Sequence, residues 1–153
     1  MSNKYNISID TKTELEFNDI INLGKVKKFL DFICDYLKIK NCEISVIFSD
    51  SNTIKTLNNQ YRNINEPTDV LSFPFEGDDF IVGIKHLRYL GDIIICPKIC
   101  NQNALDYSEE PEKELLRLIV HGVLHLYGYD HNTNQATEPM IILQEKILLS
   151  FIN

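Results

Sequence analysis

A long buried helix is predicted by the segment Glu109-Glu-Pro-Glu-Lys-Glu-Leu-Leu-Arg-Leu-Ile-Val-His-Gly-Val-Leu-His-Leu-Tyr127. Its first turn is acidic, which favours a helix N-terminus because the carboxylates lie at the positive end of the helix dipole. The body of the segment is largely apolar, as is typical of a helix buried in the core of a domain. Gly128 follows, and glycine readily adopts the left-handed backbone conformation that ends a helix. We therefore expect a core helix over residues 109–127, with the chain reversing at Gly128.

Three of the four histidines lie at the end of this predicted helix. His121 and His125 are one helical turn apart, so their imidazoles lie on the same face and can share one ion. In a continued helix His131 would lie about 15 Å further along the axis, but a reversal at Gly128 can bring it back toward the other two. Three neutral imidazoles suit Zn²⁺. The sequence therefore predicts one zinc ion per chain, held by His121, His125 and His131.

The spacing of these histidines also bears on the chemistry of the site. Three protein ligands leave the fourth position of a tetrahedral zinc ion open, as in catalytic sites, and a water molecule there has its pKa lowered to about 7. Histidines at offsets zero, four and ten, with glycine at offset seven, match the extended zinc-protease motif. Gly122, however, stands where that motif carries its general base, a glutamate. The pattern favours a hydrolase but removes the proton acceptor that peptide hydrolysis needs.

Other residue types that bind metals are scattered along the chain. Cys96 and Cys100 are four residues apart, which would allow a second metal site, but an unliganded cysteine usually behaves as a small buried hydrophobic residue. With four cysteines in the whole chain, a disulfide framework is not expected. His86 stands alone, and we interpret it as an ordinary loop or surface histidine.

Length and composition are those of one ordinary globular domain. A chain of 153 residues, with 44% hydrophobic and 24% charged residues, is long enough to bury a core and is neither disordered nor fibrous in composition. No apolar run approaches the roughly 20 residues that span a bilayer, and the polar start lacks the apolar segment of a signal peptide. We therefore expect a single domain over residues 1–153, in the cytoplasm and without membrane contact.

The net charge of −7 argues against a general nucleic-acid-binding protein, and no DNA partner is expected, because nonspecific affinity for phosphates comes largely from lysine and arginine. Several lysines nevertheless gather in and just after one predicted helix. They are Lys25, Lys27, Lys28, Lys38 and Lys40. These lysines form either a basic binding face or an ordinary solvated helix surface.

Hydrophobic periodicity predicts the remaining elements. Strands are expected at residues 4–10, 43–48, 69–74 and 90–96. Helices are expected at residues 24–37, 51–61, 97–105, 109–127 and 135–151. Asp50 or Ser51 caps the second of these helices, and a turn is expected around Asp78. The predicted fold class is α+β, a single domain with a small mixed four-stranded sheet packed against about five helices, with the metal site at the end of the long helix.

A second candidate site residue is Arg62, which ends the segment Leu57-Asn-Asn-Gln-Tyr-Arg62 shortly before a predicted strand. Its planar guanidinium stays charged and binds phosphate oxygens through two parallel hydrogen bonds. Arg62 could therefore hold a phosphodiester if the fold brings it to the zinc site. An ion pair with a nearby carboxylate, such as Glu66 or Asp69, is equally compatible with the sequence.

Some segments of the chain resemble the YbeY family of bacterial endoribonucleases. They are Leu57–Phe75, Leu90-Gly-Asp-Ile-Ile-Ile95 and His121–His131, which with their spacers cover roughly half of the chain. The resemblance implies a zinc ion on the three histidines, with Arg62 as a catalytic residue that faces the RNA backbone. It also implies cleavage of single-stranded RNA, maturation of the 3′ end of small-subunit ribosomal RNA, and ribosome quality control. The implied partners are ribosomal RNA and ribosomal subunits or assembly proteins.

The sequence leaves the mechanism and two other functions open. The nucleophile is either water activated by zinc or the 2′-hydroxyl of the RNA, and no residue is identified as the general base. Asp69, Asp92 and Asp130 are interpreted as residues that orient a ligand or support the structure. The functional alternatives are a non-enzymatic ribosome-assembly factor with a structural zinc, and a zinc hydrolase of a substrate other than RNA.

Overall fold

The computed structural model describes residues 3–10, 21–77, 80–82 and 85–153. The helices in this part of the chain are α2 (Leu23–Leu37), α3 (Ser51–Arg62), α4 (Pro97–Asp106), α5 (Pro111–Leu126) and α6 (Pro139–Ile152). The strands are β1 (Lys4–Ile9), β2 (Cys42–Phe48), β3 (Val70–Pro74), β4 (Phe80–Val82) and β5 (Lys85–Ile95). None of the helices within these ranges is both long and apolar enough to cross a membrane.

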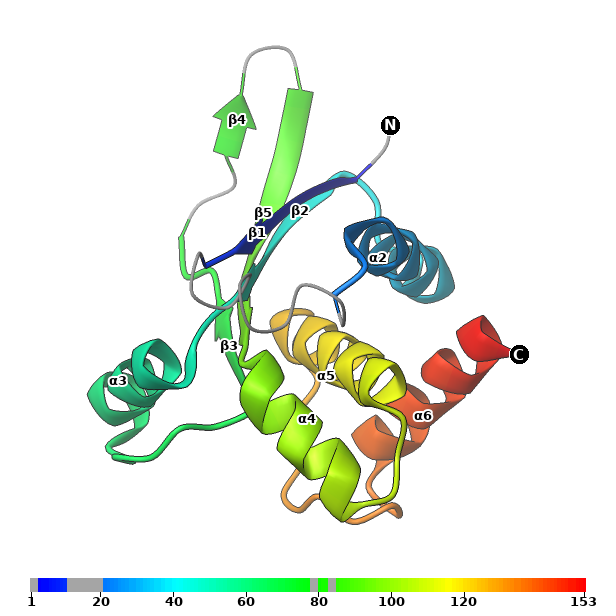
Figure 1. Cartoon of the computed structure of the whole chain (residues 1–153). Coiled ribbons are helices and arrows are strands. Elements are labelled where there is room, and N and C mark those ends of the chain that lie inside the picture. Colours follow the sequence, from blue (N-terminus) through cyan, green and yellow to red (C-terminus); the bar gives the residue numbers. More distant parts are fainter. Residues whose placement is uncertain (1–2, 11–20, 78–79, 83–84) are drawn as a thin grey trace.

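Four of the strands form a mixed sheet in the order β1-β2-β5-β3 (Figure 1). Strands β1 and β5 run parallel to β2, whereas β3 runs antiparallel to β5. The prediction of an α+β domain with a small mixed four-stranded sheet and about five helices is thus confirmed for the described residues.

Strand β4 and the first part of β5 were not predicted from the sequence. Strand β4 pairs antiparallel with residues 85–87 of β5, which begins at Lys85 and not at Leu90. His86 therefore lies in a strand and not in a loop. The turn expected around Asp78 falls outside the described residues. A strand of only three residues, such as β4, carries too little periodicity to be recognised without its partner.

Different helices cover the two faces of the sheet. Ile93 and Ile95 of β5 belong to the main core, which they share with residues of α2, α5 and α6. These three helices lie together on one side of the sheet, and α3 lies on the other (Figure 1). Ile94 packs against α3 in a smaller cluster with Ile54 and Leu71. Burial on both faces explains the continuous run of isoleucines in β5.

Prolines determine where the last two helices begin. Helix α5 begins at Pro111 and not at Glu109, and α6 begins at Pro139 and not at Gln135. Proline fits the first helical turn because its missing N–H has no helical partner there, and it disfavours helical geometry in the residue before it. Helix α3 begins as predicted, since the side chain of Asp50 caps it by accepting a hydrogen bond of 2.8 Å from a backbone N–H.

The four cysteines are buried and free. Cys96 packs in the smaller cluster with α3, whereas Cys100 belongs to the main core. Burial raises the pKa of both thiols, which keeps them protonated and makes them poor metal ligands. The spacing of these two cysteines therefore reflects packing, as expected for unliganded thiols.

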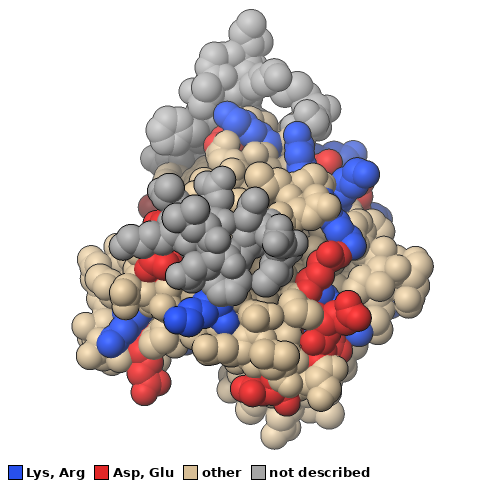
Figure 2. Space-filling view, in the orientation of Figure 1, with Lys and Arg blue, Asp and Glu red and all other residues tan. Residues whose placement is uncertain are grey.

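Charged side chains of both signs share the surface shown in Figure 2. Lysine and arginine side chains lie beside acidic ones on the right-hand side of this face. Lys25 of α2 forms an ion pair with Glu112 of α5. The basic face that the lysines of α2 could form is therefore interrupted by a carboxylate at this point.

Helix α5 approaches β5 closely at Gly122. The glycine is buried, and a Cβ atom added to it would lie 2.7 Å from Cγ2 of Ile93, well inside ordinary contact distance. This position of the helix therefore faces the sheet. The residue that follows His121 lacks a side chain because the helix and the strand leave no space for one.

We predict that Gly122→Ala lowers the free energy of unfolding by about 1–2 kcal/mol, because overpacking against Ile93 outweighs the gain in helix propensity. Gly24→Ala in α2 is the matched control, since the nearest atom to an added Cβ there is Oδ1 of Asn22, at 3.5 Å. The control should be as stable as the wild type or more so. Urea unfolding of both variants measures the difference. Equal stability of Gly122→Ala and the wild type would show that α5 and β5 are less closely packed at this position than the 2.7 Å distance indicates.

Candidate metal centre

Helix α5 ends in a hydrogen-bonded reversal of the backbone. Gly128 has a positive φ of 98°, as predicted for the residue that ends the helix. Its N–H donates to the carbonyl of His125 at 3.1 Å, and the N–H of Tyr129 donates to the carbonyl of Leu124 at 2.9 Å. Together these bonds form a Schellman motif, which satisfies carbonyls in the last turn. The segment after Gly128 thereby brings His131 back to the end of the helix.

Ligand atoms of His121, His125 and His131 lie within 4.8 Å of one another. The Nε2 atoms of His121 and His125 are 3.1 Å apart, and the ring centroids of the three residues are separated by 4.6 to 5.1 Å. Two nitrogens bound to one tetrahedral zinc ion, each at about 2.05 Å, are about 3.3 Å apart. Elsewhere among the described residues no other such group is found. The three histidines can therefore hold one metal ion, and their nitrogen donors suit zinc.

Hydrogen bonds hold the outer nitrogens of two of the rings. Nδ1 of His131 lies 2.8 Å from the backbone carbonyl of Thr133, which can only accept, so Nδ1 carries the proton and Nε2 is left for a metal ion. Nδ1 of His121 lies 2.6 Å from Oε1 of Gln144, with the same consequence. Metal-binding histidines are commonly held by an acceptor in this way. Neither acceptor was predicted, because one is a backbone atom and the other lies 23 residues away on a different helix.

The aspartates that were interpreted as supporting residues make structural contacts. Asp130 accepts a hydrogen bond of 2.8 Å from the backbone N–H of His131, so it orders the loop and does not contact the ring. Asp69 accepts a hydrogen bond of 3.2 Å from an asparagine side chain of α4. Asp92 accepts a hydrogen bond from a tyrosine of its own strand.

The three histidines line an open cavity of about 680 Å³. Tyr61 and Arg62, at the end of α3, line the same cavity together with residues 68–74. Arg62 is exposed, and no carboxylate of the described residues lies within ion-pair distance of it. The ion pair with Glu66 or Asp69 that the sequence allowed is therefore not formed in this part of the chain. The fold brings an arginine and three imidazoles to one opening.

Burial favours the form of the histidines that binds a metal ion. It lowers the pKa of His121, and burial together with the neighbouring His121 and His131 lowers the pKa of His125. Only a neutral imidazole offers a lone pair to a metal ion. The lowered pKa values therefore keep both rings able to bind a metal ion at neutral pH.

An imidazole cluster and an arginine that share one open cavity are features of metal-dependent hydrolases, in which three protein ligands leave a coordination position accessible. The fold and the site thus define the class of protein.

Comparison with known proteins identifies the family within this class. The family model described as Endoribonuclease YbeY matches residues 6–152. A relative named Endoribonuclease YbeY from Treponema denticola is 36% identical over 100% of this chain and 96% of its own length. One of the same name from Staphylococcus saprophyticus is 39% identical over 90% of this chain and 95% of its own length. The chain therefore belongs to the YbeY family of endoribonucleases, as its three segments predicted.

A solved structure supports the same relationship. The solution structure of TM1509 from Thermotoga maritima matches with a TM-score of 0.61 and 32% sequence identity, over 94% of this chain and 86% of that one. The similarity therefore extends through nearly the whole chain and not only through the three short segments.

We predict that the metal-free protein loses stability as the pH falls below about 6.5, the ordinary pKa of histidine. His121 and His125 have lowered pKa values in the folded chain. The unfolded chain therefore binds more protons than the folded chain in the range between the folded and ordinary pKa values, and the free energy of unfolding decreases on acidification. Urea unfolding in EDTA between pH about 5.5 and about 7.5 measures the effect, away from most carboxylate titrations. His125→Asn should weaken this dependence, and a stability that rises on acidification would contradict the burial of these rings.

Proposed function

We propose that this chain is a zinc-dependent endoribonuclease that cleaves single-stranded RNA. We further propose that it acts in maturation of the 3′ end of small-subunit ribosomal RNA and in ribosome quality control. The proposal is carried by the cavity that Arg62 shares with the three histidines. Metal ligands alone would suit many substrates, but an added guanidinium favours one that contains a phosphodiester. The endoribonuclease activity in the names of the family and its relatives supports the same reaction here.

The charges of the cavity favour one phosphate at a defined place over a broad attraction for nucleic acid. The net charge of the chain is −7, and Asp69 and Asp130 line the cavity with Arg62. These carboxylates repel a phosphodiester, whereas Arg62 attracts it. Substrate binding should therefore depend strongly on Arg62 and on metal occupancy.

An exposed aromatic ring beside Arg62 supports an unpaired RNA strand as the substrate. Tyr61 lines the cavity, is 61% exposed, and packs edge-on against Phe73 with the ring centroids 5.1 Å apart. A ring held in this way can stack on a base, and bases are accessible for such stacking in single strands, loops and ends. Tyr61 and Arg62 are adjacent, so together they can contact a base and a neighbouring phosphate.

The residues of the cavity have distinct roles in the proposed reaction. The three histidines would hold the metal ion through ring nitrogens, and the Nε2 atoms of His121 and His125 face each other. Zinc, when bound, supplies Lewis-acid chemistry at the phosphate or at the attacking group. Arg62 stabilises the negative charge that develops on the phosphoryl oxygens by donating hydrogen bonds to them. The Gly122 position cannot supply a base, because it faces Ile93 of the sheet.

The attacking group is either a water molecule or the 2′-hydroxyl of the RNA. Attack by water leaves a 5′-phosphate or a 3′-phosphate, whereas attack by the 2′-hydroxyl leaves a cyclic phosphate. Mass spectrometry of the product ends distinguishes these two routes.

The exposure of the histidine cluster supports a catalytic ion over a structural one. A structural zinc ion is usually enclosed by four protein ligands, whereas these three histidines are partly exposed and line a cavity. The non-enzymatic assembly factor is therefore the weaker alternative. A zinc hydrolase of another substrate would leave Arg62 without a role. The ribosomal role, and with it a location in the cytoplasm, is supported by the family resemblance alone.

We predict that the purified chain contains about one zinc ion and cleaves a short single-stranded RNA, and that His125→Ala loses both properties because a ligand is removed. Circular dichroism should show that this variant remains folded, since the core does not depend on the ion. Unfolding of His125→Ala would instead support a structural zinc. Zinc binding by the wild type without cleavage of RNA, including ribosomal RNA in small subunits, would contradict the nuclease function.

We predict that Arg62→Ala lowers kcat/KM for RNA cleavage by about 10²–10³-fold, as expected when a donor to developing charge is removed. Zinc content and thermal stability should not change. Arg62→Lys should have an intermediate rate, because it keeps the charge but loses the planar fork. Lys98→Ala is the matched control, since it removes an exposed positive charge of α4 outside the cavity. Unchanged cleavage by Arg62→Ala would exclude the proposed phosphate contact.

A further inference from the structure

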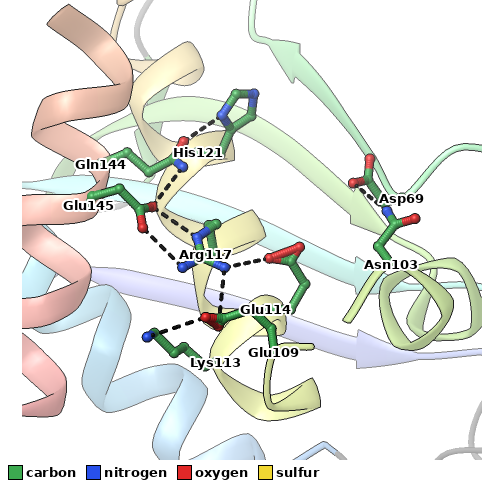
Figure 3. A network of polar contacts seen from close by, with 9 residues as sticks. All are labelled: Asp69, Asn103, Glu109, Lys113, Glu114, Arg117, His121, Gln144 and Glu145. Atoms are coloured by element: carbon green, nitrogen blue, oxygen red, sulfur yellow. Dashed lines mark hydrogen bonds and ion pairs between the residues drawn. The ribbon is translucent and has the colours of Figure 1, made fainter. Parts of the chain in front are cut away.

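A chain of hydrogen bonds joins helices α5 and α6 behind the metal centre (Figure 3). Arg117 of α5 donates from Nε and Nη2 to the two carboxylate oxygens of Glu145 of α6, at 2.9 Å each. Its Nη1 donates to Glu114 at 2.7 Å. Nε2 of Gln144 donates to Glu145 at 3.1 Å, and Oε1 of the same amide lies 2.6 Å from Nδ1 of His121. The chain of bonds thus begins at an arginine and ends at a metal-ligand ring.

Donors and acceptors along this chain can be arranged in only one direction. A guanidinium can only donate, and an ionised carboxylate can only accept. Burial alone would raise the pKa of the Glu145 carboxyl, but hydrogen bonds from Arg117 and Gln144 lower it, so the group is ionised at neutral pH. Only the NH₂ end of the Gln144 amide can therefore face Glu145. The carbonyl end is left to face His121.

This orientation decides which ring nitrogen of His121 carries the proton. A carbonyl oxygen accepts, so Nδ1 is protonated and Nε2 keeps its lone pair on the side of His125. A reversed amide would place its NH₂ group against Nδ1, and the ring proton would then occupy Nε2 and block a metal ion. The reversal would also set the amide oxygen against the Glu145 carboxylate, which is unfavourable.

Burial limits the access of water to the Gln144 amide. Gln144 is 5% exposed, although it lines a second open cavity with His121 and Glu145, and the side chain of Glu145 is 35% exposed. The two hydrogen bonds from Arg117 hold the Glu145 carboxylate beside the amide and thereby favour one direction of it. Gln144 lies outside the lining of the cavity that contains Arg62, so its effect on that cavity is transmitted through His121.

We propose that Gln144 is a positioning residue that selects the metal-binding tautomer of His121, and that Glu145 and Arg117 fix the direction of its amide. The inference rests on the proposed metal centre, but it concerns the state of the ligands before the ion binds. The tautomer of His121 is therefore measurable without zinc and without RNA.

The first test is the tautomer of His121 in the metal-free protein at neutral pH, read from the nitrogen-15 shifts of its ring by NMR. The wild type should carry the proton on Nδ1. Gln144→Met has a similar volume but no amide, so the Nε2-protonated form should become substantial. Gln144→Glu keeps an acceptor oxygen and should retain the Nδ1-protonated form. Gln102→Met, at an exposed position of α4, is the matched control and should behave as the wild type.

Zinc affinity is a second measurement that does not depend on RNA cleavage. Competition with a chromophoric chelator should show about 10- to 100-fold weaker binding by Gln144→Met, the range expected when the partner behind a ligand is lost. Gln144→Glu should bind zinc more tightly than Gln144→Met. If Gln144 only supported packing, its replacement would lower Tm without changing the tautomer, and that result would overturn the proposal.

Glu145→Gln tests the role of the carboxylate. If Gln144→Met does not fold, this second variant tests the proposed control of the His121 tautomer in its place. An amide at position 145 can both donate and accept, so both directions of the Gln144 amide are allowed and His121 should show both tautomers. Retention of the Nδ1-protonated form by every folded variant would overturn the proposal.

RNA cleavage by the wild type and the variants is measured in parallel. The wild type could bind zinc but not cleave RNA, while the variants lose the Nδ1-protonated form. That pair of results would support the role of Gln144 and overturn only the nuclease function.

Discussion

The hydrogen bonds that end α5 at Gly128 bring the three histidines of the candidate metal centre together. His121 and His125 lie within the last two turns of the helix, and His131 is returned to them by the left-handed residue that follows. The helix is held in the core and packs closely on β5 at Gly122, so its end has a defined place relative to the sheet. The loop beyond it is ordered locally, since His131 is bonded to Thr133 and Thr133 to Glu138. The centre therefore joins a buried helix end to a loop that is ordered by its own hydrogen bonds.

Features that follow from local rules were predictable from the sequence. Helical spacing placed His121 and His125 on one face, and the conformational freedom of Gly128 accounted for the return of His131. Periodicity located the strands of the main sheet, because alternating or continuous burial leaves a mark on adjacent residues. The starts of α5 and α6 were predicted too early in the chain, because the acidic and polar residues before Pro111 and Pro139 were included in the helices. Proline favours the first turn of a helix, so both helices begin at these prolines.

Local rules of this kind could not predict contacts between segments that are distant in the sequence. The sequence left the partner of Arg62 open, and the cavity that it shares with the histidines arises because α3 packs on the sheet through Ile54. The missing glutamate at Gly122 was evident from the motif, but the direction of that position toward Ile93 was not. Gln144 carried no signal at all, since its contact with His121 depends on how two helices pack. The roles of these residues in catalysis stay predictions, whereas their positions are features of the fold.

The hydrogen-bond chain from Arg117 to His121 crosses into α6, which follows all three histidine ligands in the sequence. A ribosome delivers a chain from its N-terminus, and packed elements join a fold only after they have been made. While α6 is still being synthesised, the three histidines have already been made, but the amide that orients His121 has not. Met140, Ile147 and Leu148 of α6 are also missing from the core at that stage. A chain that stops before α6 therefore carries all three candidate metal ligands, but neither the contact that orients His121 nor a complete core.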